Sequence, residues 1–548
     1  MKFRLLLLIT LFPYLALSQL SSVAEGPSFE EPENGYARIL LLENGNTAYL
    51  HITKKDGINL RLYDAQHKEI VNKEITPSYG KLKGATVNGI FDIDGMITAF
   101  ISEFDDKTPT LYRLKINSQT GELIETKTIA TLIKASMGQG YAVIFGGVPM
   151  PEFLVRKDPA SNNCGVVRYN TFTENREERV ELIQYSESGA ENYRTFLSSP
   201  DAKYKYTQIL DFAVVGTDAY ALLYSYNTAK SGGAANELLL ATVKNGTVTY
   251  KNLGKSISRR IDDGLLRYNP VTGNLIFLTL EKTSTESKGL YNQTVNYAAQ
   301  FNIIDPNNTE IKKTVDMRRS SASMKYRKLF KDDEPFSGMP QQIYINEDGS
   351  FTLVLEEIKQ KYRTNTRNGM PVSSSPSGIE LGSVAVITYS EDGEERSSHI
   401  IPKLQTTLSS AWDQANYTTA SNFYIAKRDN CAVPLSGGNQ FKSFAYLHSK
   451  DKPYVLLNDV AENEERILKG KLTNVKGVGD CEGYVYDLTA ASDTKNPLMP
   501  RALVFGKENS KERNLAIFSI SDYSRSRKEY ATLKLEKGKG VKLVWLKG

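Results

Sequence analysis

A repeated pair of hairpins constrains this chain more than any other feature of its sequence. Between Ile343 and Ile401, the segment IYI-NEDG-SFTLVLEE is followed, after a polar gap, by SVAVITYS-EDGE-ERSSHII. Apolar residues alternate on both sides of each acidic-glycine turn, which is the strongest short-range signal for a β-hairpin. Two such hairpins predict a four-stranded antiparallel sheet. One sheet of this kind cannot bury both of its faces, so the unit has to recur along the chain.

The same plan does recur, at irregular intervals. The clearest second copy is GIFDIDGMITAFISEF, followed by TLYRLKINSQTGELIETKTI. The copies are predicted to begin near Ile39, Ile90, Tyr141, Ile209, Leu265, Ile343, Phe444 and Leu503. Seven or eight four-stranded units in series favour an all-β fold, a β-propeller, because each sheet packs on the next and ring closure removes most exposed edges. Tandem β-sandwich domains are the alternative.

The first 18 residues have the pattern of a cleavable signal peptide. Met-Lys-Phe-Arg is followed by short apolar runs and then by the small residues Ala16 and Ser18. We therefore predict that residues 1–18 are removed and that the protein is exported, to the periplasm or to the exterior or cell surface. No later stretch approaches the roughly 18 apolar residues that a spanning helix needs, so no transmembrane segment is expected.

The rest of the chain is expected to form a flexible leader over residues 19–36 and a single propeller domain over residues 37–548. Residues 404–434 interrupt the repeat plan and are interpreted as an insertion in that domain. The apolar alternation of Val541–Leu546 predicts a last strand, which we expect to complete the first blade and close the ring.

The three cysteines, Cys164, Cys431 and Cys481, bear on the compartment. An exported chain meets an oxidising environment, where one disulfide is expected. We prefer Cys431 with Cys481 because both lie where the repeat plan is most disrupted, and three unpaired cysteines are the alternative. No CxxC motif is present and no turn carries a complete calcium loop, so we expect no metal and no cofactor.

Charge and motifs exclude several classes of function. The formal net charge is +5, and basic and acidic residues are mixed throughout, whereas nucleic-acid binding needs a concentrated basic surface. The chain has four histidines but no HExxH, GxSxG, P-loop or dinucleotide-binding glycine pattern. These observations argue against nucleic-acid partners, metalloproteases, α/β-hydrolases and nucleotide-dependent enzymes.

The insertion offers the best candidate for a binding surface. It places Trp412, Tyr417 and Tyr424 among polar residues. Exposed aromatic rings stack on sugars and anchor protein partners, and function concentrates in excursions from a rigid scaffold. We therefore predict that these three residues bind a partner.

Acidic residues offer the competing, catalytic interpretation. Glu103 with Asp105 and Asp106, and Glu356 with Glu357, follow the second strand of a clear unit in each case. Two carboxylates about 5–10 Å apart suffice for glycoside hydrolysis. Equivalent positions in a repeat are also what a structural role would give, so the test is whether these groups converge on one cavity. We assign no catalytic residue from the sequence.

Two segments, VAVITYSEDGEERSSHIIPKLQ and FKSFAYLHSKDKPYVLLND, resemble parts of exported, largely uncharacterised β-propeller-like repeat proteins of Bacteroidota-type Gram-negative bacteria. The resemblance covers roughly residues 341–459 and implies export and a propeller. The leading hypothesis is a non-catalytic binding or scaffold protein of the cell envelope, which holds an envelope protein or a polysaccharide on one propeller face. The alternative is a glycan-active hydrolase or lyase that uses paired carboxylates.

Overall fold

The computed structural model describes most of the chain between Leu20 and Lys547. The described residues are 20–54, 56–77, 85–105, 108–146, 148–200, 203–228, 236–254, 261–287, 293–308, 310–331, 335–367, 370–408, 433–436, 438–442, 444–449, 452–489, 498–506, 514–536, 538 and 540–547.

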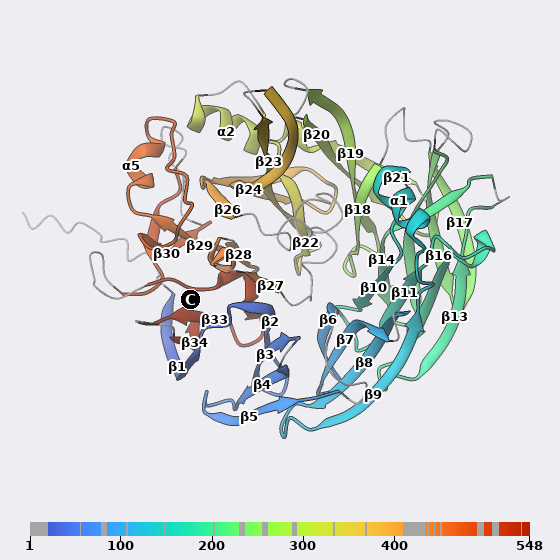
Figure 1. Ribbon diagram of the computed structural model, residues 1–548, viewed down its shortest axis with the longest axis horizontal. Helices are drawn as coiled ribbons and strands as arrows, with labels where there is room; N and C mark the ends of the chain where they lie inside the picture. Colours follow the sequence, from blue (N-terminus) through green and yellow to red (C-terminus); the bar gives the residue numbers. More distant parts are fainter. Residues whose placement is uncertain are drawn as a thin grey trace, which may run out of the picture.

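Eight antiparallel sheets surround a common centre, which makes the protein an eight-bladed β-propeller (Figure 1). The predicted all-β propeller is confirmed, and the tandem β-sandwich alternative is not realised. We number the sheets as blades 1 to 8 in chain order. Among the four strands counted for each blade, the first lies nearest the centre of the ring, as β2, β6, β22 and β28 show in Figure 1.

The strands of the first four blades follow one another along the chain. Blade 1 contains β2 (Asn34–Leu41), β3 (Thr47–Thr53), β4 (Gly57–Tyr63) and β5 (Glu69–Ile75), and blade 2 contains β6 (Thr86–Ile93), β7 (Met96–Asp105), β8 (Thr108–Asn117) and β9 (Leu123–Thr131). Blade 3 contains β10 (Glu152–Lys157), β11 (Cys164–Tyr169), β12 (Val180–Tyr185) and β13 (Glu191–Leu197), and blade 4 contains β14 (Tyr206–Val215), β15 (Asp218–Tyr226), β16 (Asn236–Lys244) and β17 (Thr247–Gly254).

Blades 5 to 7 repeat the order, and blade 8 departs from it. Blade 5 contains β18 (Ile261–Tyr268), β19 (Leu275–Ser287), β20 (Gln293–Ile304) and β21 (Ile311–Asp316), and blade 6 contains β22 (Met339–Ile345), β23 (Phe351–Arg367), β24 (Met370–Tyr389) and β25 (Glu395–Ile401). Blade 7 contains β28 (Phe444–Leu447), β29 (Tyr454–Val460), β30 (Cys481–Asp487) and β31 (Arg501–Leu503), and blade 8 contains β32 (Asp522–Ser524), β33 (Glu529–Leu535), β34 (Gly540–Lys547) and β1 (Ser21–Glu30).

Short Asx-Gly turns set the register of the hairpins. Asp94 and Gly95 join β6 to β7 with φ angles of +53° and +68°. Asn245 and Gly246 join β16 to β17 with φ angles of +50° and +80°. Positive φ at both central residues is what a two-residue type I′ turn requires, and this turn matches the right-handed twist of paired strands.

The hydrophobic core lies between neighbouring blades. Leu50 and Leu60 of blade 1 belong to one buried cluster with Ile90 of blade 2. Between blades 5 and 6, the ring of Phe301 meets the ring of Phe351 edge-on, at a centroid distance of 5.2 Å. Each blade therefore buries its faces against the next blade, which is why one unit could not fold alone.

The two ends of the chain close the ring together in blade 8. Strand β1 pairs with β34 from Ser21 opposite Lys547 to Glu30 opposite Gly540. Two expectations are corrected by this pairing. The segment expected as a flexible leader over residues 19–36 contains β1, and the C-terminal strand belongs to the last blade rather than the first. The physical reason is that β34 has one edge free after pairing with β33, and the N-terminal segment covers it.

Two other unit boundaries also differ from the predicted ones. Tyr141 was expected to begin the third unit in a strand, but it lies in helix α1 (Met137–Gly146), because β10 to β13 already supply four strands. Leu503 was expected to begin the eighth unit, but it ends β31 in blade 7. The long connection between β29 and β30 moves the fourth strand of that blade to this later position.

The two faces of the ring differ in their connections. We call one the hairpin face, because the tight turns between first and second strands and between third and fourth strands lie there. The opposite, helix face carries the longer connections, with α1, α2 (Ser321–Phe330) and α5 (Asn463–Ile467). None of the helices among the described residues is long and apolar enough to cross a membrane.

The insertion connects blade 6 to blade 1 before the chain enters blade 7. Its start, β26 (Gln405–Leu408), pairs with β24. Its end, β27 (Val433–Ser436), pairs with the inner edge of β2 and adds a fifth strand to blade 1. Residues 409–432, which separate these two strands, lie outside the described residues.

Candidate functional site

A cavity of about 520 Å³ lies at the centre of the ring, toward the hairpin face. Its walls come mainly from the first strands of blades 1, 6, 7 and 8 and the residues beside them, and Pro159 approaches from blade 3. Its size falls in the range of small-molecule sites, which are about 300–1,000 Å³. We call it the central cavity.

Two tyrosines and a histidine form one wall of the central cavity. Tyr344 lies near the end of β22, and Tyr446 and His448 lie at and just beyond the end of β28. The ring centroid of Tyr344 lies 5.0 Å from that of Tyr446 and 4.8 Å from that of His448. Neighbouring rings of this kind offer apolar faces on which a sugar ring can stack.

The imidazole of His448 is buried and neutral. Burial, together with the nearby positive charge of Arg525, lowers the pKa of His448 to about 3. Its Nε2 lies 2.6 Å from Oδ1 of Asn346 and 3.1 Å from Nη2 of Arg525. The first contact suits a protonated Nε2 and the second an unprotonated one, so the tautomer decides which contact is a hydrogen bond.

The charged groups around the cavity are predominantly positive. Arg38 and Arg525 line it together with Asp522, which carries the one carboxyl group among the described lining residues. Asp522 accepts a hydrogen bond from the backbone N–H of Leu41 at 2.8 Å, and its Oδ1 lies 4.0 Å from Nη2 of Arg38. Burial raises the pKa of Asp522, and Arg38 opposes this effect. The cavity therefore favours an anionic ligand.

A series of buried ion pairs and hydrogen bonds connects the central cavity to the opposite side of the ring. Asp211 of β14 is fully buried and lies 2.8 Å from the guanidinium of Arg156 and 3.1 Å from that of Arg267. Arg267 also donates a hydrogen bond to Oε1 of Gln342, which lines the cavity, at 2.8 Å. These contacts tie the innermost strands of blades 3 to 6 together and hold Gln342 in place.

The predicted binding residues and one of the two predicted disulfide cysteines belong to the insertion. Trp412, Tyr417 and Tyr424 lie outside the described residues, so their role stays a prediction. Cys431 also lies outside them, and its disulfide with Cys481 stays a prediction. Burial raises the pKa of the Cys481 thiol to about 12.

The candidate carboxylates are dispersed. Glu103 lies on β7 of blade 2, where its own carboxylate accepts a hydrogen bond from the N–H of Phe104 at 2.8 Å. Glu356 lies on β23 of blade 6 and forms a fully buried ion pair of 2.6 Å with Lys403. Both residues lie on the second strand of their blade, in two separate blades, and neither lines the central cavity. Asp106 and the side chain of Asp105 lie outside the described part of the chain.

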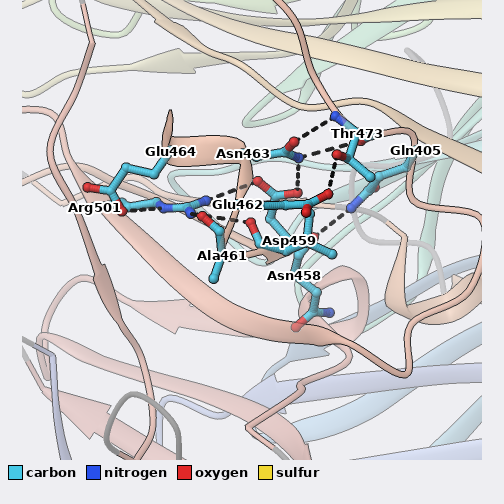
Figure 2. Close-up of polar contacts among 10 residues, drawn as sticks. Gln405, Asn458, Asp459, Ala461, Glu462, Asn463, Glu464, Thr473 and Arg501 are labelled. Carbon is cyan, nitrogen blue, oxygen red and sulfur yellow. Dashed lines mark hydrogen bonds and ion pairs between the residues drawn. The ribbon is translucent and has the colours of Figure 1, made fainter. Parts of the chain in front are cut away.

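A second polar cluster, in blade 7, has a structural role (Figure 2). Asp459 accepts hydrogen bonds from Arg501 at 3.0 Å and from Asn463 at 2.7 Å. The Oδ1 atom of Asn463 in turn accepts a hydrogen bond from the N–H of Thr473 at 2.7 Å. The guanidinium of Arg501 also lies over the ring of Tyr484, 3.9 Å from its centroid. These contacts fix α5 and the connection after it to the edge of the blade.

No group of three or more histidine, cysteine, aspartate or glutamate side chains in the described residues has the geometry of a metal site.

Sequence reasoning missed the central cavity. His448 was one of four histidines without a motif, and Arg525 and Tyr344 lie far from it along the chain. The three residues share one feature of the sequence, which is that each lies at or beside the end of the first strand of a blade. This feature identifies a common site only when the blades are arranged in a ring.

No family model and no curated protein matches this chain. Among solved structures, the polysaccharide lyase Uly1 aligns with a TM-score of 0.34 at 10% identity, over 87% of this chain and 93% of that chain. The α-L-arabinanase of Penicillium chrysogenum aligns with a TM-score of 0.28 at 9% identity, over 70% of this chain and 98% of that chain. The Bacteroides ovatus xyloglucan protein GH43B aligns with a TM-score of 0.26 at 9% identity, over 75% and 96%.

Proposed function

We propose that the protein acts on an acidic glycan bound in the central cavity, and that it cleaves this glycan by elimination. The observation that carries the proposal is the neutral imidazole of His448 beside the guanidinium of Arg525, in a cavity walled by tyrosine rings. This proposal develops the glycan-active alternative that the sequence suggested. It replaces the paired carboxylates of that alternative with a histidine base, an arginine and a tyrosine acid.

Binding of an acidic sugar is supported by the chemistry of the cavity walls. Tyr344 and Tyr446 supply ring faces, and Arg38 and Arg525 supply positive charge. The Nε atom of Arg38 is buried and has no hydrogen-bond partner among the described residues. A buried donor without a partner is costly, and a ligand oxygen would satisfy it.

Elimination would use groups that the cavity holds. A base removes the proton from the carbon next to the sugar carboxylate, the bond from the adjacent carbon to the glycosidic oxygen breaks, and a double bond forms between the two carbons. Neutral His448 would accept the proton, Arg525 would stabilise the charge that develops on the carboxylate, and Tyr344 would protonate the leaving oxygen. A carboxylate next to Arg525 would also offset the positive charge that helps to keep the pKa of His448 low.

Hydrolysis by paired carboxylates is less well supported. It needs two carboxyl groups about 5–10 Å apart across the substrate. Among the described residues that line the central cavity, Asp522 alone carries one.

A binding role without catalysis is the second candidate function. The observation that favours it is the double contact of His448 Nε2 with Asn346 and Arg525. An imidazole held in this way would be a fixed part of the binding wall and could not take up a proton from a substrate.

The test compares turnover with binding in the chain from residue 19 onward. Polygalacturonate and alginate are offered as acidic polysaccharides, and arabinan as a neutral one. The absorbance of the unsaturated sugar and the release of reducing ends are measured together with the melting temperature. We expect both products from an acidic polysaccharide, and a loss of about 10²–10⁴-fold in rate for His448→Ala.

The control is Arg319→Ala, which removes an exposed arginine far from the central cavity and should leave the rate unchanged. Reducing ends without the unsaturated sugar would replace elimination with hydrolysis. A melting shift that Arg525→Ala abolishes, without any product, would establish the binding-only role. No response to any acidic polysaccharide would refute the proposal.

A further inference from the structure

A second cavity, of about 370 Å³, lies between blades 6 and 7 toward the helix face. It is bounded by α2, by the middle of β23, by β24 and by the chain that follows α5. Its lining shares no residue with that of the central cavity, which lies toward the opposite face. We call it the α2–α5 cavity.

The walls of the α2–α5 cavity are held together by direct contact. Gly470, just after α5, has a φ of +72°, and a Cβ atom built there would lie 3.0 Å from the carbonyl oxygen of Phe330 at the end of α2. The glycine therefore permits both a left-handed backbone and close approach of the two segments.

The inner wall presents a carboxyl group. Glu357 is buried, and its Oε2 accepts a hydrogen bond from the N–H of Ser383 at 3.1 Å. Gly382 makes room for it, because a Cβ atom at that position would lie 2.7 Å from the same oxygen. Burial raises the pKa of Glu357, and Lys359 opposes this shift. In either protonation state this carboxyl can hydrogen-bond a sugar hydroxyl.

The rim is positively charged. Lys359 is 54% exposed, and its Nζ lies 3.8 Å from Oε1 of Glu357. Arg466 and Lys471 also line the cavity, and their side chains make no ion pair with the described residues. Lys403 adds no net charge, because it is buried against Glu356. Glu380 is the remaining acidic group on the lining, so the rim carries a net positive charge.

An aromatic ring completes the set of contacts. Tyr326 of α2 lines the cavity and packs against Phe330, with a ring-centroid distance of 4.6 Å. A ring held by packing keeps its orientation, and its face can support a pyranose ring.

We propose that the α2–α5 cavity is a second ligand site and that it takes a sugar acid, such as a uronic acid. The ligand carboxylate pairs with Arg466 and Lys471, its hydroxyls bond the carboxyl of Glu357, and its ring lies against Tyr326. The proposal does not depend on the proposed function of the central cavity.

The test uses isothermal titration of the chain from residue 19 onward with D-galacturonate, and with D-galactose as its uncharged counterpart. All titrations are made in an Arg525→Ala background, so that binding in the central cavity does not contribute. We expect saturable binding of galacturonate at one site and at least tenfold weaker binding of galactose. Combined Arg466→Ala and Lys471→Ala should weaken galacturonate binding by about tenfold to a hundredfold.

The matched control is Lys469→Ala, an exposed lysine of the same segment that does not line the cavity. It should bind galacturonate like its parent. Glu357→Gln, which keeps an acceptor for Ser383, is expected to weaken both sugars alike, because it alters a hydroxyl contact. Melting temperatures show whether each variant is folded.

Three results would overturn the proposal. They are no saturable binding of galacturonate in the Arg525→Ala background, equal affinity for galacturonate and galactose, and full affinity after loss of Arg466 and Lys471. If no acidic polysaccharide is cleaved but galacturonate still binds as expected, the proposed function of the central cavity is refuted and the site in the α2–α5 cavity stands.

Discussion

Several ionisable side chains of this propeller are buried, and their environments decide which form is stable. Lys403 and Glu356 are fully buried and neutralise each other at 2.6 Å. His448 and His399 have no such carboxylate partner, and burial lowers their pKa values to about 3 and about 4. The two histidines stay neutral because a charge in a protein interior needs an opposite charge nearby, and neither histidine has one.

The buried histidines predict a loss of stability in mild acid. An unfolded histidine has a pKa of about 6.5, so below that pH the unfolded chain takes up protons that the native His448 and His399 do not. The free energy of unfolding therefore falls as the pH decreases from about 6.5 toward 4, by up to about 1.4 kcal/mol per pH unit for each histidine. Above pH 6.5 these groups have no effect.

Urea unfolding at several pH values between 7.5 and 5 measures this dependence. His399→Gln cannot take up the proton in either state, so its free energy of unfolding should fall less steeply with decreasing pH than that of the parent. Parallel slopes for the two proteins would show that the native His399 titrates normally.

At the scale of the element, β1 is the strand that closes the ring. Its side chains are mostly exposed, yet its backbone pairs with β34 along almost the whole strand. It also joins the first residues of the domain to the last blade. Without it, β34 would present an unpaired edge to solvent, and the two ends of the ring would lose their direct connection.

Removal of β1 should therefore destabilise the whole ring. We compare a chain that begins at Leu20 with one that begins at Glu31, after the end of the strand. The shorter chain is expected to melt several degrees lower and to aggregate more readily, since its open edge can pair with other chains. Differential scanning calorimetry and light scattering measure the two effects. Equal melting temperatures would show that the closure of the ring does not rest on β1.

At the scale of the whole molecule, closure brings distant residues into shared sites. The central cavity combines residues of blades 1, 6, 7 and 8, and the α2–α5 cavity combines residues of blades 6 and 7 with the connections on the helix face. The closed ring thus has two cavities on opposite faces, each built from loops and strand ends.

We also propose that the molecule is exported, as its first residues predict. Expression in a Gram-negative host should give a periplasmic or secreted protein whose first residue is Gln19, which N-terminal sequencing would identify.

The exported protein should also contain the predicted disulfide. Alkylation under denaturing conditions, followed by mass spectrometry, should find Cys164 modified and Cys431 joined to Cys481. Recovery in the cytoplasm with residues 1–18 intact would contradict export, and three alkylated cysteines would contradict the disulfide.

The sequence by itself determined the repeat, the strands and the architecture of this protein. Alternation of apolar residues and Asx-Gly turns are local properties, and they predicted the hairpins of blades 2 and 6 and the propeller built from them. The same local signals placed the starts of two units wrongly, at Tyr141 and Leu503. Whether a segment becomes a strand there depends on the neighbouring strand with which it would pair, and that strand is not specified locally.

Only the tertiary structure decided which strand closes the ring and which residues share a cavity. His448, Arg525 and Tyr344 carry no mutual spacing in the chain, and Glu357, Arg466 and Tyr326 meet only because blades 6 and 7 pack together. Pairing between the ends of the chain and contacts between blades depend on the closed ring. They are non-local, so no pattern within a single segment can encode them.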